Sequence, residues 1–255
     1  MGSTAGNIIK PILTKNRPIG KPNIYLKVYE TIILKITKEK LEEHLCDFQL
    51  GISDFGCEKA LHTKGTGNEM HKENALISLD AVDAFQHADR GFMMRESEKV
   101  IPEAYIHIHN NLFNDMHVYY HGKTNGVDHF DNQKGCQQGK TLSSATFALG
   151  HFPYLQELKE VIQDRGAVLA IIDDTLLAMQ NGAIEEVLQK EEEIREKYGI
   201  VPNRSKSKIL CNPNREESLI QMLSEKYGYV EENILRHPDS EQGVSQIDYS
   251  IMYVG

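Results

Sequence analysis

Apolar residues along the chain recur mainly at helical spacing, and this pattern predicts several helices. The spacing runs from Tyr25 to Leu45 and again from Gly182 to Tyr198, where Glu, Lys and Arg occupy the opposite face. A third helix is expected from Glu103 to Phe113, directly after Pro102. The small apolar residues from Thr141 to Leu149 predict a fourth, packed helix.

Short, largely apolar runs between turn-forming residues predict strands. In the segment Ala167–Met179, two apolar runs flank a pair of aspartates, which predicts a strand, a tight turn and a returning strand. The other expected strands are Asn74–Asp80, Val118–Tyr120, Val127–Asn132, Ser207–Cys211 and Tyr249–Val254. Because helices and strands do not alternate regularly, the pattern predicts an α+β fold in which helices back an antiparallel sheet.

Composition narrows the class of protein. Apolar residues make up 40% of the 255 residues and charged residues 25%, as in ordinary soluble domains. No apolar stretch is long enough to span a membrane, and the first residues lack the apolar run of a secretory signal. Four cysteines lie far apart without a CxxC pair: Cys46, Cys57, Cys136 and Cys211. We therefore expect an intracellular protein, cytoplasmic or nuclear and not secreted, without a membrane partner.

Charge is distributed unevenly along the chain. The net charge is −9, which alone argues against a nucleic-acid binder. The first 40 residues, however, contain eight Lys or Arg and two Glu, a net charge of +6, so the remainder carries −15. Two interpretations stay open: a basic arm that contacts phosphates, or solvated surface lysines.

Three aspartates sit at the ends of apolar strands. Asp80 closes one strand, and Asp173 and Asp174 lie at the tip of the predicted hairpin. Carboxylates in such places are costly unless they are solvated, paired or bound to metal. Mg²⁺ or Mn²⁺ suits oxygen ligands of this kind, and two such ions can assist phosphoryl transfer. The alternative is a hairpin turn with two polar residues at its tip.

Four segments around these aspartates resemble the first four motifs of reverse transcriptases, in the family's order. They read LDAVDAF (Leu79–Phe85), GCQQG (Gly135–Gly139), AIIDD (Ala170–Asp174) and NRSKSKIL (Asn203–Leu210). Three flanking segments agree. NRPI (Asn16–Ile19) resembles the fingers of these enzymes, as does the Glu30 helix. FQLGISDFGCEKALH (Phe48–His62) resembles retroelements without long terminal repeats, and YSIMYVG (Tyr249–Gly255) resembles the primer-grip strand.

The resemblance implies the fingers and palm of a right-hand polymerase, with an antiparallel palm sheet backed by helices. The N-terminal part of the fingers would span residues 1–74, and the palm strand with the first motif residues 75–91. Residues 92–134 would form an insertion between fingers and palm, and residues 135–255 the rest of the palm. No thumb is expected within this sequence, so the thumb or other modules of a larger polyprotein would lie outside it.

The resemblance also implies a role for each motif residue. Asp80 and Asp173, assisted by the Ala81 carbonyl, would bind two Mg²⁺ or Mn²⁺ ions, and Asp174 would support the site. Lys206 would protonate the pyrophosphate leaving group, with Lys208 as the second choice. The remaining residues would contact the nucleotide. Arg17, with Lys15 as a second candidate, would hold its phosphates, and the backbone of Asp83 and Ala84 would contact the triphosphate. Phe85 would be a steric gate at the sugar, and Gln138 and Gly139 would also contact the nucleotide.

The implied reaction is RNA-templated addition of deoxynucleotides to a primer. Its partners would be an RNA template, a DNA or RNA primer and deoxynucleoside triphosphates. Two alternatives remain: a truncated, non-catalytic relic that binds nucleic acid weakly, and an RNA-templated RNA polymerase. The sequence departs from the family at Ile171 and Ile172, where an aromatic and a small residue are usual, and at Lys140, where an acidic residue is common.

Overall fold

The computed structural model describes most of the chain, and its architecture combines a sheet with helices. The described residues are 22–45, 48–54, 56, 74–113, 117–121, 127–131, 134–211, 217–228 and 234–236. Arg17, Lys15 and the predicted strand Tyr249–Val254 lie outside these ranges. Within them, no helix is both long and apolar enough to cross a membrane.

The main sheet has five strands in the order β4-β5-β1-β6-β7. Their bounds are β1 (Asn74–Leu79), β4 (Gly166–Ile171), β5 (Asp174–Gln180), β6 (Lys208–Cys211) and β7 (Ile234–Arg236). Strand β1 lies in the middle and pairs antiparallel with β5, from Asn74 opposite Gln180 to Leu79 opposite Thr175, and also with β6. The predicted strands of the sheet and the Ala167–Met179 hairpin are therefore confirmed.

One strand departs from the predicted antiparallel arrangement, because β7 pairs parallel to β6. The helix α8 (Glu217–Tyr227) lies between these two strands in the sequence. A crossover through a helix returns the chain to the end of the sheet where β6 begins, so β7 runs in the same direction as β6. A separate two-stranded ribbon of β2 (His117–His121) and β3 (Val127–Asp131) confirms the two weaker strand predictions.

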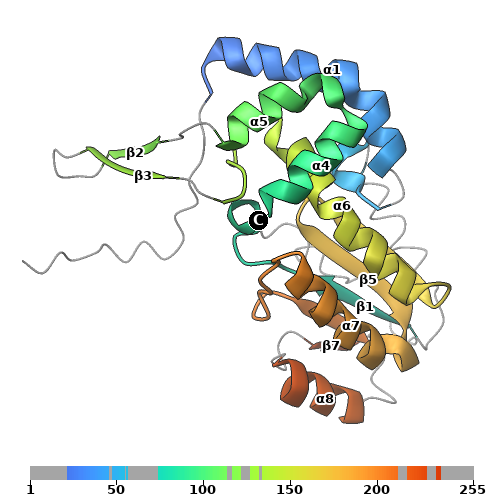
Figure 1. Ribbon diagram of the computed structural model, residues 1–255. Coiled ribbons are helices and arrows are strands. Elements are labelled where there is room, and N and C mark those ends of the chain that lie inside the picture. Colours follow the sequence, from blue (N-terminus) through green and yellow to red (C-terminus); the bar gives the residue numbers. More distant parts are fainter. Residues whose placement is uncertain are drawn as a thin grey trace, which may run out of the picture.

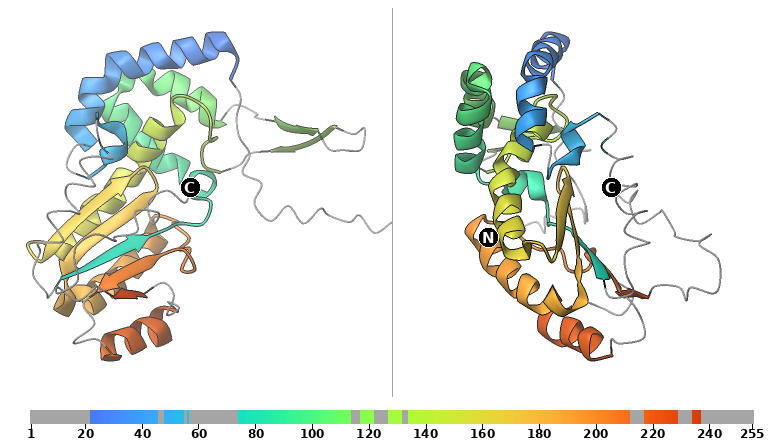
Figure 2. Two further views of the ribbon diagram at one scale, coloured as in Figure 1. Left: turned by 180° about the vertical axis from the view of Figure 1, so that it is seen from behind. Right: turned by 90° about the vertical axis from the view of Figure 1, so that its right-hand side faces the viewer.

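The helices form two groups (Figure 1). Helices α1 (Ile24–Leu45), α4 (Arg90–Val100) and α5 (Tyr105–Phe113) lie together at one end, whereas α6 (Ser143–Ile162) and α7 (Ile184–Lys197) cover one face of the sheet (Figure 2). The short elements are α3 (Ala84–His87), η1 (Leu50–Ile52), η2 (Pro102–Ala104) and η3 (Asn181–Ala183).

Helix α6 joins two hydrophobic cores. Its first half, with Phe147 and Phe152, packs among α1, α4 and α5, and its second half, with Leu155 and Leu158, packs against the sheet. Pro153 lies between the two halves and lacks a backbone N–H. The helix continues to Ile162, well beyond the predicted end at Leu149, because burial of its apolar side chains outweighs that one missing hydrogen bond.

Helix α4 was not predicted, although its sequence contains a start signal. Its residues are mostly polar, so the apolar period is weak. Asp89, however, caps the helix by accepting a hydrogen bond from the Phe92 N–H at 3.0 Å. Met93 and Met94 then anchor the helix in the core. An aspartate at the N-cap position is the feature that could have revealed this helix.

Candidate active site

Two of the predicted aspartates meet at one edge of the sheet. Asp173 lies in the tight turn between β4 and β5, where Ile171 pairs with Asp174. Strand β1 ends at Leu79 beside Thr175 of β5, so Asp80 leaves the sheet next to this turn. Asp80 and Asp173 line the same cavity. The antiparallel register therefore brings together two carboxylates that lie far apart in the sequence.

A loop after α7 brings the predicted lysine to the same place. Its backbone wraps around the end of β1: the Asn203 N–H donates to the Asp80 carbonyl at 2.8 Å, and the Asp80 N–H donates to Ser207 Oγ at 3.0 Å. Lys206 lies inside this loop, and its Nζ is 3.9 Å from Asp80 Oδ2. The first, third and fourth motifs thus meet in the structure. Lys208, the second choice for the proton donor, lies in β6.

The donor chemistry at this edge fits a divalent cation in part. Asp80 Oδ1 is buried and has no hydrogen-bond partner among the described residues, a costly state that a cation would relieve. Its neighbour in the cavity, Asp173, offers a second carboxylate. Within the described ranges, however, no group of three or more His, Cys, Asp or Glu side chains is placed to hold a metal ion. Asp174, at the start of β5, is exposed.

The rest of the first motif forms the short helix α3. Asp83 is exposed at its N-cap with φ of 45°, a left-handed conformation that a side chain disfavours. Ala84 follows it as the first helical residue. The Phe85 ring is only 7% exposed and stacks on Phe147, with ring centroids 4.6 Å apart. The predicted gate residue therefore belongs to the helical core as well.

The second motif docks onto α3. The Cys136 N–H donates to the Phe85 carbonyl at 2.8 Å, and the Gly135 N–H donates to the Ala88 carbonyl at 3.1 Å. Only glycine fits at position 135, because φ is +64° and a Cβ atom would lie 2.0 Å from the Phe85 oxygen. The half-buried Gln138 and the exposed Gly139 follow in this loop, so the second motif is held against the first.

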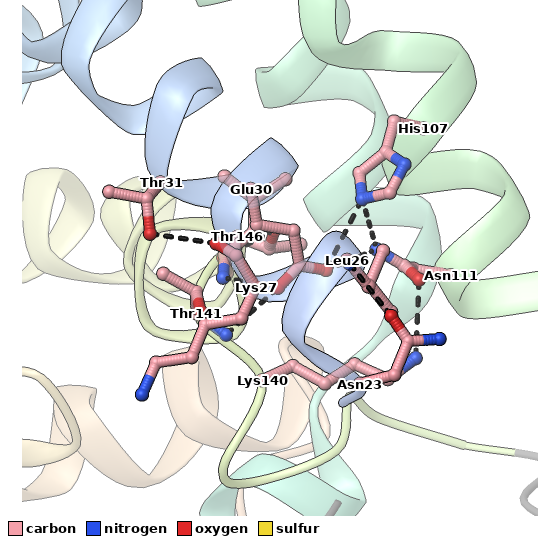
Figure 3. A network of polar contacts seen from close by, with 11 residues as sticks. Asn23, Leu26, Lys27, Glu30, Thr31, His107, Asn111, Lys140, Thr141 and Thr146 are labelled. Atoms are coloured by element: carbon pink, nitrogen blue, oxygen red, sulfur yellow. Dashed lines mark hydrogen bonds and ion pairs between the residues drawn. The ribbon is translucent and has the colours of Figure 1, made fainter. Parts of the chain in front are cut away.

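A buried carboxylate from α1 holds the other end of this loop (Figure 3). Glu30 is completely buried and accepts hydrogen bonds from the Thr141 N–H at 2.9 Å and from Asn111 Nδ2 at 3.1 Å. His107 Nε2 lies 3.2 Å from the same carboxylate. Lys140 Nζ donates to Asn111 Oδ1 at 3.2 Å; burial lowers the pKa of Lys140, and the Glu30 carboxylate opposes that effect. The resemblance assigned the Glu30 helix to the fingers but gave Glu30 no contact with this loop. The remaining signal was an acidic residue on the apolar face of a helix.

Replacing Glu30 with alanine is expected to destabilise the protein and loosen the loop. The substitution leaves buried donors without an acceptor, so the free energy of unfolding should fall by about 3 kcal/mol. Glu103→Ala is the matched control, because Glu103 pairs with Lys40 at a more exposed position, where a loss below about 1 kcal/mol is expected. Urea unfolding of both variants measures the difference, and similar losses would contradict the assigned role of Glu30.

A histidine that the sequence did not single out lies beside the two aspartates. His151 of α6 lines the cavity that Asp80 and Asp173 share. Burial lowers its pKa to about 4, and a hydrogen bond to the Ile172 backbone opposes that shift. Its Nδ1 is buried without a partner among the described residues. The imidazole is therefore neutral in the folded protein at pH 7.

This histidine is expected to make the protein sensitive to acid. Because its folded pKa of about 4 lies below the ordinary value of 6.5, its contribution is complete above pH 6.5 and is lost as the pH falls toward 4. Between pH 7 and pH 4.5 the loss should be about 2–3 kcal/mol. Urea unfolding at both pH values should show a smaller decrease for His151→Phe than for the wild type. The exposed control His109→Phe should keep the full decrease.

Comparison with known proteins adds a family and a fold. The family model described as "Reverse transcriptase (RNA-dependent DNA polymerase)" matches residues 8–249. No curated protein matches the sequence.

Three solved structures of telomerase from Candida tropicalis are similar to the chain. The apo enzyme truncated from its C-terminal domain has a TM-score of 0.56 at 14% identity, with 74% of this chain and 44% of that chain covered. The apo enzyme gives 0.58 at 11%, with 72% and 38% covered. The complex with the TWJ fragment of telomeric RNA gives 0.56 at 12%, with 72% and 34% covered. The chain thus spans less than half the length of these proteins, and at such identity the similarity establishes the fold alone.

Proposed function

Because the chain belongs to the reverse transcriptase (RNA-dependent DNA polymerase) family, we propose that it adds deoxynucleotides to a primer on an RNA template. We further propose that it is the polymerase domain of a retroelement without long terminal repeats. The observation that carries this proposal is the cavity shared by Asp80 and Asp173, with Lys206 Nζ 3.9 Å from Asp80. The primer 3′-hydroxyl would attack the α-phosphorus of the nucleotide, and pyrophosphate would leave.

The two aspartates would hold the divalent ions of this reaction. Asp80 offers a buried oxygen without a partner among the described residues, Asp173 offers a second carboxylate, and the Ala81 carbonyl would assist. Asp174 would support the site from the start of β5. When bound, Mg²⁺ or Mn²⁺ ions neutralise phosphate charge and stabilise the attacking and leaving oxygens.

The lysine near Asp80 would serve the leaving group. Its side chain is about one-third exposed, so Lys206 can turn from the carboxylate toward a phosphate in the cavity. There it would donate a proton to pyrophosphate, which lowers the cost of charge on the departing oxygen. Lys208 remains the second choice.

The nucleotide would lie between the first and second motifs. Gln138 and Gly139 would contact it from the loop that docks on α3, and the Asp83 and Ala84 backbone would contact its triphosphate. The ring of Phe85 would limit space at the sugar 2′ position and so favour deoxynucleotides. Arg17, with Lys15 as a second candidate, would bind phosphates from the basic N-terminal arm.

The proposed reaction requires two nucleic-acid strands, a template and a primer. The RNA template is supported by the family and by the solved complex of the similar Candida tropicalis telomerase with the TWJ fragment of telomeric RNA. A DNA or RNA primer would complete the nucleic-acid partner, and the protein would act inside the cell, in the cytoplasm or nucleus.

Residues 1–74 would form the N-terminal part of the fingers. Residues 75–91 and 135–255 would form the palm, and residues 92–134 the insertion between them.

Primer extension on an RNA template tests the proposed reaction. The full chain is incubated with Mg²⁺ or Mn²⁺ and with either deoxynucleotides or ribonucleotides. Extension that requires the metal and prefers deoxynucleotides supports the proposal. A preference for ribonucleotides would instead identify an RNA-templated RNA polymerase.

A second candidate is a non-catalytic relic that binds nucleic acid weakly. One observation favours it: among the described residues, no group of three or more His, Cys, Asp or Glu side chains is placed to hold a metal ion. RNA binding, measured separately by fluorescence anisotropy, without extension in Mg²⁺ or in Mn²⁺ by either this chain or a longer chain that adds a thumb, would establish the relic and refute the enzyme.

A further inference from the structure

A side chain from outside the sheet is hydrogen-bonded to the turn that contains Asp173. Gln49 follows α1 and is 1% exposed. Its Oε1 accepts a hydrogen bond from the Ile172 N–H at 2.6 Å, and its Nε2 donates to the Ile172 carbonyl at 2.9 Å. Beside this contact, the Ala170 N–H donates to the Phe48 carbonyl at 2.6 Å. One amide side chain thus satisfies both backbone groups of the residue next to Asp173.

The gripped residue has an unfavourable backbone conformation. Ile172 has φ of +57°, the left-handed region that β-branched residues avoid. Such a conformation persists only where the surroundings enforce it, and it occurs most often at functional sites. Asp173 follows directly, so the direction of its carboxylate depends on how this turn is held.

A glycine makes the close approach feasible. A Cβ atom at Gly51 would lie 2.7 Å from Ile172 Cδ1 and 2.8 Å from Ile172 N, closer than real Cβ contacts come. The Gly51 N–H also donates to Gln49 Oε1 at 3.2 Å, which fixes the amide that holds the turn. The segment Gln49–Gly51 is therefore shaped to fit against the hairpin.

We propose that Gln49 is a positioning residue that enforces the left-handed turn at Ile172 and thereby directs the Asp173 carboxylate into the cavity shared with Asp80. The inference rests on the proposed function, because it gives Asp173 its metal-binding role. Gln49 itself does not line the cavity. Its side chain bonds both backbone groups of Ile172 and the Gly51 N–H of its own segment, so it would act on Asp173 through the turn.

Hydrogen exchange in the full chain tests whether Gln49 holds the Ile172 backbone, and it does not depend on activity. Gln49→Met keeps a side chain of similar length but cannot hold the Ile172 amide. We expect that amide to exchange at least about tenfold faster, measured relative to the Leu177 amide of β5. Thr37→Val is the matched control, because Thr37 is equally buried and its hydroxyl donates to the Ile33 carbonyl of its own helix. An Ile172 amide that exchanges at the wild-type relative rate would overturn the proposal.

Enzyme kinetics test whether the hydrogen bonds from Gln49 to Ile172 orient the Asp173 carboxylate. In primer extension, Gln49→Met should lower kcat at least about tenfold and raise the Mg²⁺ concentration for half-maximal rate, while the KM for the deoxynucleotide stays within about twofold. Thr37→Val should leave all three unchanged. A Gln49→Met enzyme with wild-type kcat and Mg²⁺ dependence would refute the positioning role.

A second variant keeps the test decisive if Gln49→Met does not fold. Gly51→Ala leaves the Gln49 side chain unchanged, but its Cβ atom would lie 2.7 Å from Ile172 Cδ1 and 2.8 Å from Ile172 N, so it pushes the segment and the Gln49 amide away from Ile172. It should show the same faster exchange and the same kinetic change, and wild-type behaviour in both would overturn the proposal. If neither the wild type nor a longer chain that adds a thumb extends a primer, the proposed function fails, whereas the exchange measurement still decides whether Gln49 holds the turn.

Discussion

Asp173→Asn is expected to reduce deoxynucleotide incorporation at least about a thousandfold while leaving the fold intact. Asparagine has nearly the same size as aspartate but carries no charge, so it holds a divalent ion poorly. Asp173 lies in a turn at the sheet edge rather than in a packed core, and the free energy of unfolding should change by less than about 1 kcal/mol. Primer extension and urea unfolding of the same preparation measure the two effects.

The control for this substitution lies near the other end of β4. Asp164→Asn makes the same chemical change at an exposed position just before the strand. It should retain wild-type activity, because it lines neither the cavity nor the loop around Asp80. Activity of Asp173→Asn within about tenfold of the wild type would refute the metal-site assignment.

Phe85→Ala is expected to have two separate effects, one on stability and one on sugar selection. The ring is nearly buried and stacks on Phe147, so its loss should lower the free energy of unfolding by about 3–4 kcal/mol. If the ring also limits space at the sugar, the variant should incorporate ribonucleotides far more readily than the wild type does. Incorporation of each nucleotide, measured in competition, gives the discrimination directly.

Phe147→Leu separates the two effects. Phe147 is the stacking partner of Phe85 and is similarly buried, so its truncation also weakens the core. It does not belong to the first motif, and its variant should keep the wild-type preference for deoxynucleotides. Unchanged sugar discrimination in Phe85→Ala would refute the gate role and leave Phe85 as a core residue only.

Local patterns in the sequence were sufficient to identify most of the sheet. The hairpin around Asp173 was predicted because two apolar runs flank a polar pair, a pattern that depends only on neighbouring residues. The long helices α1 and α7 were predicted for the same reason. Helix α4 was missed because its apolar period is weak. Strand β7 was missed because its three residues are too few to show a pattern, and its parallel direction depends on the crossover through α8.

The sequence alone also determined the order of the motifs and the family. Each motif is a short run of neighbouring residues, so it can be recognised without knowledge of the tertiary structure. Only the tertiary structure decided which residues meet: Lys206 beside Asp80, Glu30 under the second motif, and Gln49 against the turn at Ile172. These contacts join residues far apart in the sequence, and they form only when strand register and helix packing bring their backbones together. A polar residue such as Glu30 or Gln49 looks like an ordinary surface residue until burial forces it to find a partner, and burial is a property of the folded chain.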